Sequence, residues 1–411
     1  MAGRSAGRLV RRLGTSDAVV IGLGAMIGAG IFASFAPAAA AAGSGLLAAL
    51  GIAAIVAYCN ATSSARLAAR YPSSGGTYVY GRERLGPFWG YLAGWAFVVG
   101  KTASCAAMAL TVGAYVWPAR AHVVAVCAVV ILTAVNYTGL QKAIWLVRAI
   151  VVAVVAVLAV VVTICLTGSA AIAAGPGPAN GFVGIIRAAA LLFFAFAGYA
   201  RIATLGEEVR DPARTIPRAI PLALGITLVV YATVAVAVLR TLGAARLAAS
   251  TAPLADAVRA AGAPGLVPMV TVGAAAAALG SLLALILGVS RTTLAMARDH
   301  HLPAALAAVH PRFEVPHRAE VAVGIVVAVA AAVADLRAVI GFSSFGVLLY
   351  YAIANASAWT LSTRRRVVPA VGLAGCLLLA VLLPTSSVIS GALVIAAGIV
   401  LYLVRNRRRT A

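Results

Sequence analysis

The chain has 411 residues, of which 63% are apolar and only 10% are charged. A soluble domain usually carries about 25% charged residues, so this composition excludes an ordinary water-soluble protein and favours one embedded in a lipid bilayer. The formal net charge of +22 would suit a nucleic-acid partner. The basic residues, however, lie at the ends of apolar runs and form no continuous stripe beside aromatic side chains, so we expect no nucleic acid.

Apolar runs of membrane-crossing length recur along the chain. A helix needs about 20 mostly apolar residues to cross the hydrocarbon core, and counting such runs predicts an all-α membrane protein with about twelve transmembrane helices. The ninth and the eleventh are the shortest. The expected spans are 17–40, 43–65, 87–117, 121–140, 143–167, 182–206, 218–240, 266–290, 319–335, 338–361, 367–383 and 386–404.

Basic residues are unevenly shared between the two sets of loops. If both termini lie on one side, that side carries most of the arginines. The opposite side has only Arg120, Arg187, Arg240, Arg246, Arg259 and Arg337. Loops rich in arginine and lysine stay in the cytoplasm, so we expect both termini to be cytoplasmic and the protein to cross the cytoplasmic (inner) membrane several times.

The first span contains the glycine-rich segment GLGAMIGAGIF, Gly22 to Phe32. Each glycine weakens a helix by about 1 kcal/mol relative to alanine. Small residues also allow close packing of membrane helices, which is one interpretation. The other is a break near the middle of the membrane, where the amides at the start of a half-helix hold an anionic group.

Lys101 lies near the centre of the third span. An ionisable residue at that depth is costly and is a functional hypothesis by default. Lys101 would supply a fixed cation in place of a sodium ion, or carry a proton; alternatively, it snorkels or pairs with a backbone carbonyl. No aspartate or glutamate lies in the middle of a span, and all histidines lie in loops or at their edges. The sequence therefore gives no support to a carboxylate or imidazole relay across the midplane.

The sixth span contains FFAFAGYARIATLGEEV, Phe193 to Val209, where a glycine is flanked by aromatic residues and followed by polar ones. Two interrupted helices, five spans apart, indicate an inverted repeat with a binding site between its halves. We therefore predict a single transporter domain, 1–411. Its first repeat would be 1–167, its second 182–361, and two additional helices would occupy 367–404.

The loop from Glu207 to Ile220 mixes both signs of charge. It would be either a solvated connector, with Pro217 starting the seventh span, or an ion-pair latch on the inner gate. The later stretch from Thr241 to Gly265 is amphipathic, and we expect short helices over the outer vestibule.

Four segments together resemble the amino acid, polyamine and organocation superfamily, most closely the cationic amino-acid transporter and related bacterial permease branch. They follow one another in the expected order over the first ten spans. The segments are GLGAMIGAGIF, YPSSGGTYVYGRERLGPFWGYLAGW, FFAFAGYARIATLGEEVRDPARTIPRAI and SRTTLAMARDHHLPAALAAVHPRFEVPHRA. The resemblance implies alternating access on a five-plus-five inverted-repeat fold with discontinuous helices one and six.

The resemblance also implies which backbone groups hold the substrate. The carboxylate would meet the backbone around Ile27, Gly28, Ala29 and Gly30. The amino group would meet carbonyls around Phe194, Ala195, Phe196 and Ala197. Phe196 and Tyr199 would cap or line the side-chain pocket, unless they are packing or lipid-facing aromatics. Broken helices favour both roles, because free amides attract anions and free carbonyls attract cations.

Departures from the family pattern bear on the substrate. Many carriers of basic amino acids have an acidic residue just after Gly198 and Tyr199, where this chain has Ala200 and Arg201. A neutral or acidic amino acid is therefore expected.

Other positions concern coupling and gating. Some proton-coupled relatives have a lysine in span five, where the nearest basic residue here is Arg148; it would be a permanent charge or snorkel to the interface. Lys101, Arg148 and Arg201 are thus the candidates for coupling or charge. Arg201 and Arg291 have the same two interpretations, a permanent charge in the membrane or a side chain that snorkels to the interface, and snorkelling is favoured for Arg291. The gate candidates are Glu207, Glu208 and Arg66, which replaces a glutamate common in relatives.

The function predicted is secondary transport of an amino acid. An enzyme would need a nucleophile with a base, or a metal cluster, and neither is present in the spans. A channel would favour polar rings along a continuous pore. A polyamine or other organic-amine permease or exchanger, and a sensor that binds without transport, remain alternatives. No cofactor and no metal are expected, proton coupling is left open, and the oligomeric state is undetermined.

Overall fold

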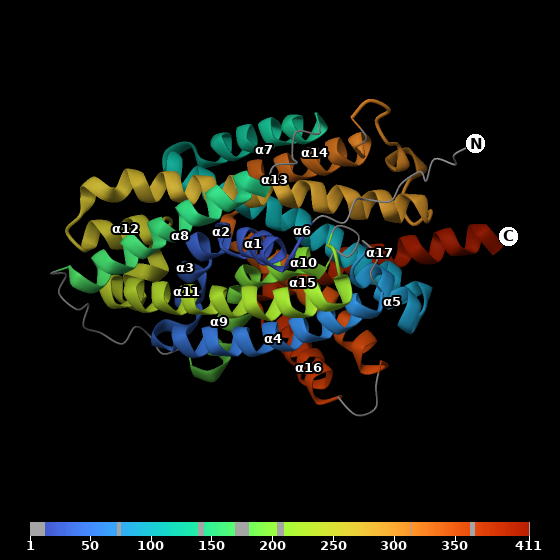
Figure 1. Ribbon diagram of the computed structural model, residues 1–411, viewed down its shortest axis with the longest axis horizontal. Helices are drawn as coiled ribbons and strands as arrows, with labels where there is room; N and C mark the ends of the chain where they lie inside the picture. Colours follow the sequence, from blue (N-terminus) through green and yellow to red (C-terminus); the bar gives the residue numbers. More distant parts are fainter. Residues whose placement is uncertain are drawn as a thin grey trace.

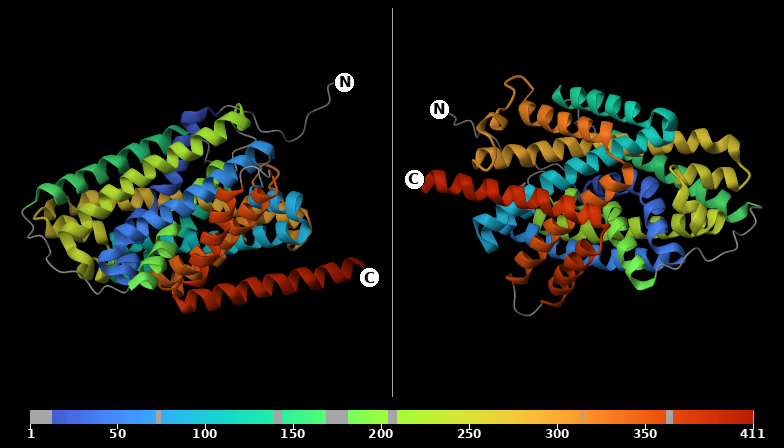
Figure 2. Two further views of the ribbon diagram at one scale, coloured as in Figure 1. Left: turned by 90° about the horizontal axis from the view of Figure 1, so that it is seen from below. Right: turned by 180° about the vertical axis from the view of Figure 1, so that it is seen from behind.

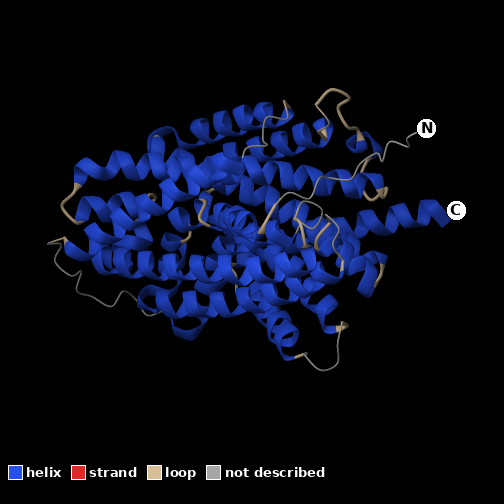
Figure 3. Cartoon of the chain, in the orientation of Figure 1, coloured by secondary structure: helices blue, strands red, loops and turns tan. Residues whose placement is uncertain are grey.

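The computed structural model describes residues 13–71, 75–138, 144–168, 181–203, 209–313, 315–361 and 366–410. Throughout this part the regular elements are helices, and none is a strand (Figure 3). Helices suit a lipid-embedded chain because each satisfies its own backbone hydrogen bonds. The all-α prediction is confirmed.

Ten stretches of the described chain are long and apolar enough to cross a membrane. The remaining predicted spans, the ninth and the eleventh, correspond to shorter helices. The bounds are α1 (Thr15–Met26), α2 (Ala29–Ala33), α3 (Phe35–Ala42), α4 (Leu46–Arg70), α5 (Thr77–Leu85), α6 (Pro87–Val116), α7 (Ala121–Tyr137), α8 (Ile144–Thr167), α9 (Gly181–Phe196), α10 (Ala200–Ala203), α11 (Pro212–Ala249), α12 (Pro253–Ala260), α13 (Val267–Arg298), α14 (His317–Val333), α15 (Leu336–Trp359), α16 (Val367–Val381) and α17 (Thr385–Thr410).

The bundle has two distinct ends (Figure 1). One end holds α5 and the end of α17, and is called the terminal face. The opposite end holds α12 and is called the outer face. Between them α6 is the most enclosed of the ten candidate spans, with 78% of its most apolar segment buried, whereas the corresponding segments of α7 and α17 are only 17% buried. Accordingly α17 lies along the outside of the bundle (Figure 2).

Helix α11 differs from the predicted seventh span. It begins at Pro212 and not near Pro217, and both Pro217 and Pro221 lie inside it. Pro212 stands at the start of the helix, where its missing N–H costs nothing. Gly243 has a φ of 70°, which bends the chain before α12. The expected short helices of this stretch are present as α12 and the 3-10 turn Pro264–Leu266, and their position over an outer vestibule stays a prediction.

Candidate functional site

The first span is interrupted between α1 and α2. The backbone leaves the helix at Ile27 (φ −79°, ψ 52°) and Gly28 (φ −109°, ψ −140°). A Cβ atom at Gly28 would collide with the side chain of Ser281 from α13. Ser281 Oγ in turn donates a hydrogen bond of 2.8 Å to the carbonyl of Gly24. The predicted discontinuity is confirmed, and α13 holds it in place.

The sixth span changes its helix type instead of unwinding. Between α9 and α10, residues Ala197–Tyr199 form a 3-10 turn. A tighter turn changes which carbonyls are bonded within the helix, and two carbonyls here accept side-chain donors. Lys101 Nζ donates to the Ala197 carbonyl at 3.1 Å. Tyr231 Oη lies 3.0 Å from the Ala195 carbonyl and 2.5 Å from that of Met26, so one hydroxyl links both interrupted spans.

Glycines bring the two interrupted spans into backbone contact. A Cβ at Gly30 would lie 2.6 Å from Ala195 Cα, and one at Gly198 would lie 2.7 Å from Met26 N. Real Cβ atoms do not approach backbone atoms so closely, so glycine is required at both positions. The glycines that predicted breaks therefore also provide the close packing that was the alternative interpretation.

A cavity of about 80 Å³ lies between the interrupted spans, α6 and α13. Six residues predicted for substrate binding or charge line it, namely Gly30, Phe194, Ala195, Ala197, Lys101 and Arg201. Five predicted substrate-binding residues are outside the lining, namely Ile27, Gly28, Ala29, Phe196 and Tyr199. The backbone of the breaks thus borders the cavity only in part.

Phe196 and Tyr199 are buried in the surrounding core. The Phe196 ring lies 5.1 Å from that of Tyr231, and the Tyr199 ring lies 5.0 Å from that of Tyr351. These separations are typical of packed aromatic pairs. In this conformation the two side chains pack around the 3-10 turn of the sixth span, and Phe97 and Phe194 are the aromatic residues of the cavity wall.

The described lining of the cavity is basic. Lys101, Arg201 and Arg291 line it, and no aspartate or glutamate is among its described lining residues. Lys101 is only 5% exposed, and its amine bonds a backbone carbonyl, as one of its two interpretations expected. Arg291, for which snorkelling was favoured, is exposed and also borders the cavity. The remaining wall includes apolar side chains such as Met108 and Leu285.

The other charge and gate candidates lie elsewhere. Arg148 forms an ion pair with Asp17 at the start of α1 and does not line the cavity. Arg66 lies on the last turns of α4, also outside the lining. Glu207 and Glu208 fall outside the described residues. In the described part of the segment that contains them, Asp211 and Arg214 form an exposed ion pair of 3.8 Å at the start of α11.

Contacts between the cavity and the outer face close the cavity on that side. Tyr115 Oη donates to the Phe32 carbonyl at 3.0 Å, and the Leu254 amide donates to the same hydroxyl at 3.3 Å. The Phe32 and Tyr115 rings meet edge to face at 5.7 Å. These contacts join α2, α6 and α12. In the other direction the lining continues along α13 to Thr292, so the cavity extends toward the terminal face.

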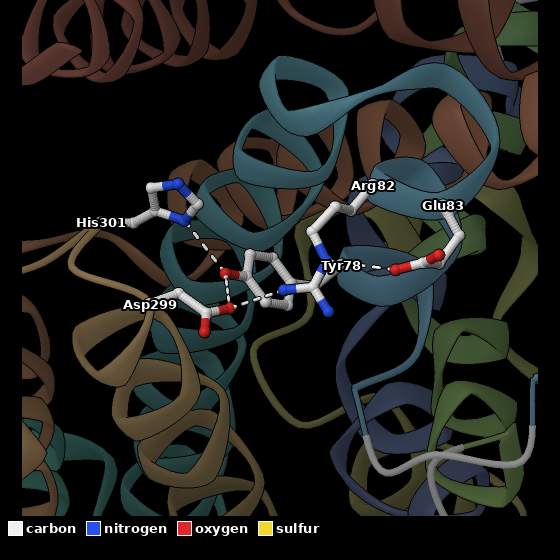
Figure 4. Close-up of polar contacts among 5 residues, drawn as sticks. All are labelled: Tyr78, Arg82, Glu83, Asp299 and His301. Carbon is white, nitrogen blue, oxygen red and sulfur yellow. Dashed lines mark hydrogen bonds and ion pairs between the residues drawn. The ribbon is translucent and has the colours of Figure 1, made fainter. Parts of the chain in front are cut away.

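A polar cluster links α5 to the end of α13 at the terminal face (Figure 4). Asp299 accepts hydrogen bonds from Tyr78 Oη and, at 2.8 Å, from Arg82 Nη1. Tyr78 Oη also lies 3.0 Å from His301 Nδ1, and Arg82 Nε lies 3.4 Å from Glu83. Burial, followed by the bond to Asp299, raises the pKa of the Tyr78 hydroxyl. We call Tyr78, Arg82, Asp299 and His301 the α5–α13 latch.

The latch is a functional candidate that sequence reasoning did not identify. Its members belong to two of the family-like segments, but Tyr78 and Asp299 are 221 positions apart. No local pattern indicates that they meet. The signal available was the polar character of α5 and the polar residues that follow the otherwise apolar α13.

A second cavity, of about 240 Å³, lies at the outer face. Its His122 and Asp335 side chains already have structural partners. His122 Nδ1 bonds the Ala331 carbonyl at 2.8 Å, and Asp335 accepts the amides of Arg337 and Ala338 at the start of α15. In the described ranges no group of three histidine, cysteine or acidic side chains is close enough to hold a metal ion.

Comparison with known proteins agrees with the architecture. The amino acid permease family matches residues 17–404. The chain therefore belongs to this family, within the amino acid, polyamine and organocation superfamily. It is a multi-pass membrane transporter and not an enzyme. The predicted resemblance is confirmed.

Three relatives illustrate the range of similarity. A protein of Mycobacterium tuberculosis described as an uncharacterized transporter is 70% identical, over 97% of this chain and 92% of its own length. The branched-chain amino acid permease BcaP of Bacillus subtilis is 24% identical, over 98% and 94%. The human cationic amino acid transporter 4 is 28% identical, over 84% and 58%.

Proposed function

We propose that the chain carries a neutral amino acid across the cytoplasmic membrane by alternating access, with both termini in the cytoplasm. The observation that supports this most is the cavity between two interrupted helices, lined by three basic side chains and by no acidic one among the described residues. Such a lining favours a ligand with a carboxylate. It disfavours a polyamine, which has only positive charges to offer.

The breaks provide a place for each end of a zwitterion. A helix start leaves its first amides without partners inside the helix. Of the predicted residues at the start of α2, Gly30 borders the cavity, so the carboxylate would lie toward Gly30 and Lys101. The amino group would lie toward the carbonyls of Ala195 and Ala197. The Ala197 carbonyl already accepts from Lys101 at 3.1 Å and from Tyr351 at 3.4 Å, so the substrate amino group would replace one of these donors.

The cavity wall favours an uncharged side chain. Phe97, Phe194 and Met108 present apolar surface. A basic side chain would instead approach Arg201 and Arg291, and two like charges at 4 Å repel by about 4 kcal/mol at an effective dielectric constant of 20. The relative named as a branched-chain amino acid permease supports the same substrate class. An acidic amino acid is the second candidate, because the same basic lining would accept it.

Access would alternate between the two faces. The Phe32–Tyr115–Leu254 contacts close the outer side, and the cavity extends toward the terminal face, as expected of a carrier that faces the cytoplasm. Opening outward would require the outer contacts to separate and the terminal face to close. The α5–α13 latch would hold α5 against α13 through that rearrangement.

Counterflow in proteoliposomes tests this proposal. Vesicles containing the full chain are loaded with unlabelled L-leucine and diluted into a trace of labelled L-leucine. We expect transient accumulation of label, inhibited by neutral amino acids but not by arginine or putrescine. Inhibition by glutamate alone would indicate the acidic class. A sensor or a channel would give no exchange-driven accumulation, and that result would refute the proposal.

A further inference from the structure

Glu320 is a buried carboxylate to which the proposed transport mechanism assigns no role. It lies in the first turn of α14 and is 0% exposed. Neither of its carboxylate oxygens has a hydrogen-bond partner among the described residues. An ionised carboxylate is costly to remove from water unless it is paired. Glu320 is therefore expected to hold a proton in at least one state of the protein.

The helix opposite Glu320 contributes further oxygen atoms without partners. Thr133 Oγ1 and Asn136 Oδ1 on α7 are buried and unpaired within the described structure. The register of α7 and α14 places them near Glu320. One turn before Glu320, the His317 ring lies 6.1 Å from the Tyr137 ring. One turn after it, Gly324 packs against Thr133. Glu320 thus faces the stretch of α7 that contains Asn136.

A proton on Glu320 would supply what this cluster lacks. Asn136 Nδ2 already donates to the Leu283 carbonyl of α13 at 3.2 Å, so Asn136 turns its acceptor oxygen to the remaining space. An ionised carboxylate can only accept hydrogen bonds, whereas a protonated one also donates. A neutral Glu320 could therefore bond Asn136 Oδ1, and an ionised Glu320 could not. A proton would therefore let Glu320 and Asn136 satisfy each other.

Arg291 connects Glu320 with the substrate cavity. It is the basic side chain whose charge acts on Glu320, and it also lines the cavity. Burial favours neutral Glu320, while Arg291 and the start of α14 favour the ionised form. The other titratable groups near this contact are His317 and Arg318 on α14, His310 beside His317, and Tyr137 on α7. Lys101 on α6 is directed to Ala197.

We propose that Glu320 is a proton-binding site whose charge acts on the cavity through Arg291, so that the chain carries a proton together with its substrate. This inference rests on the proposed function and names its coupling ion. Protonation removes the negative charge that attracts Arg291, and more of the Arg291 charge then acts on the substrate carboxylate. Proton and substrate strengthen each other's binding, by the factor of about 5 to 150 that is usual for coupled sites.

The test compares two forms of leucine transport in proteoliposomes containing the full chain. E320Q has the shape of protonated glutamate but cannot release a proton. We expect E320Q to retain leucine counterflow. The factor by which an acidic exterior accelerates leucine uptake should be at least about fivefold smaller in E320Q than in wild type. E320D should keep the response to the proton gradient, and so should the matched control H317N. A wild-type response in E320Q, a lost response in H317N, or uptake driven by sodium instead of protons would overturn the inference.

A second measurement does not depend on transport. Infrared difference spectra of the protein in nanodiscs, between mildly acidic and mildly alkaline buffer, report carboxyl groups that gain a proton. We expect wild type to show a buried carboxyl band that E320Q lacks, and identical spectra would overturn the inference. If wild type shows this band but no leucine counterflow, the proposed function fails and the proton site stands.

Discussion

Gly198→Ala tests the contact between the two interrupted spans. The added Cβ would lie 2.5 Å from the Ala25 carbonyl carbon and 2.7 Å from Met26 N. These are backbone atoms that cannot rotate away, so α1 and the 3-10 turn must separate. Overpacking of this kind costs about 1–3 kcal/mol, and we expect the upper half of that range because no side chain can yield.

Gly225→Ala is the matched control. It lies within α11, and a Cβ there would meet nothing within 4 Å, so alanine should be neutral or stabilise the helix by up to about 1 kcal/mol. Thermal unfolding of both variants in detergent measures the difference, and leucine counterflow reports on the site. If the Gly198 variant unfolds at the same temperature as the Gly225 variant, the two spans are not in backbone contact.

Three further predictions concern single side chains. Y231F removes the hydroxyl shared by the two interrupted spans, so unfolding in detergent should require about 1–3 kcal/mol less; an unchanged stability would mean that the carbonyls find other donors. K101M should weaken leucine binding, measured by calorimetry, at least about tenfold, or about 1.4 kcal/mol, and K101R should weaken it less. If wild type and K101M bind leucine with equal affinity, Lys101 is not part of the site. The pKa of the Tyr78 hydroxyl is raised above its usual 10.0 in the folded protein. The hydrogen bond of Tyr78 to Asp299 therefore contributes its full stability to the fold below pH 10, and this contribution is lost as the pH rises through the raised pKa. Y78F should lack this alkaline loss in unfolding experiments, and an identical pH profile would show that the latch contributes nothing.

The helices were predictable because their signal is local. Apolar runs indicate membrane spans whatever surrounds them, and the glycines around Gly28 and Gly198 indicate where two spans come apart or pack closely. The start of α11 was predicted six residues late, since Pro217 resembles a first helical residue as well as Pro212 does. The repeat boundaries remain predictions.

The site was only partly predictable because it depends on contacts between distant residues. Lys101 was recognised from its depth, but its bond to Ala197 depends on the fold. The directions of Phe196 and Tyr199 depend on Tyr231 and Tyr351, which pack against them. Glu320 begins an apolar run, and hydropathy cannot distinguish a carboxylate at the interface from one that α7 and α13 cover completely.

The central claim is that the interrupted helices hold the carboxylate of an amino acid. The most direct measurement compares the binding of L-leucine and L-leucinamide, which differ in that charge but share the side chain and amino group. We predict that leucinamide binds at least about tenfold more weakly to wild type, about 1.4 kcal/mol, and that K101M narrows the difference. Equal affinities in wild type would contradict the account.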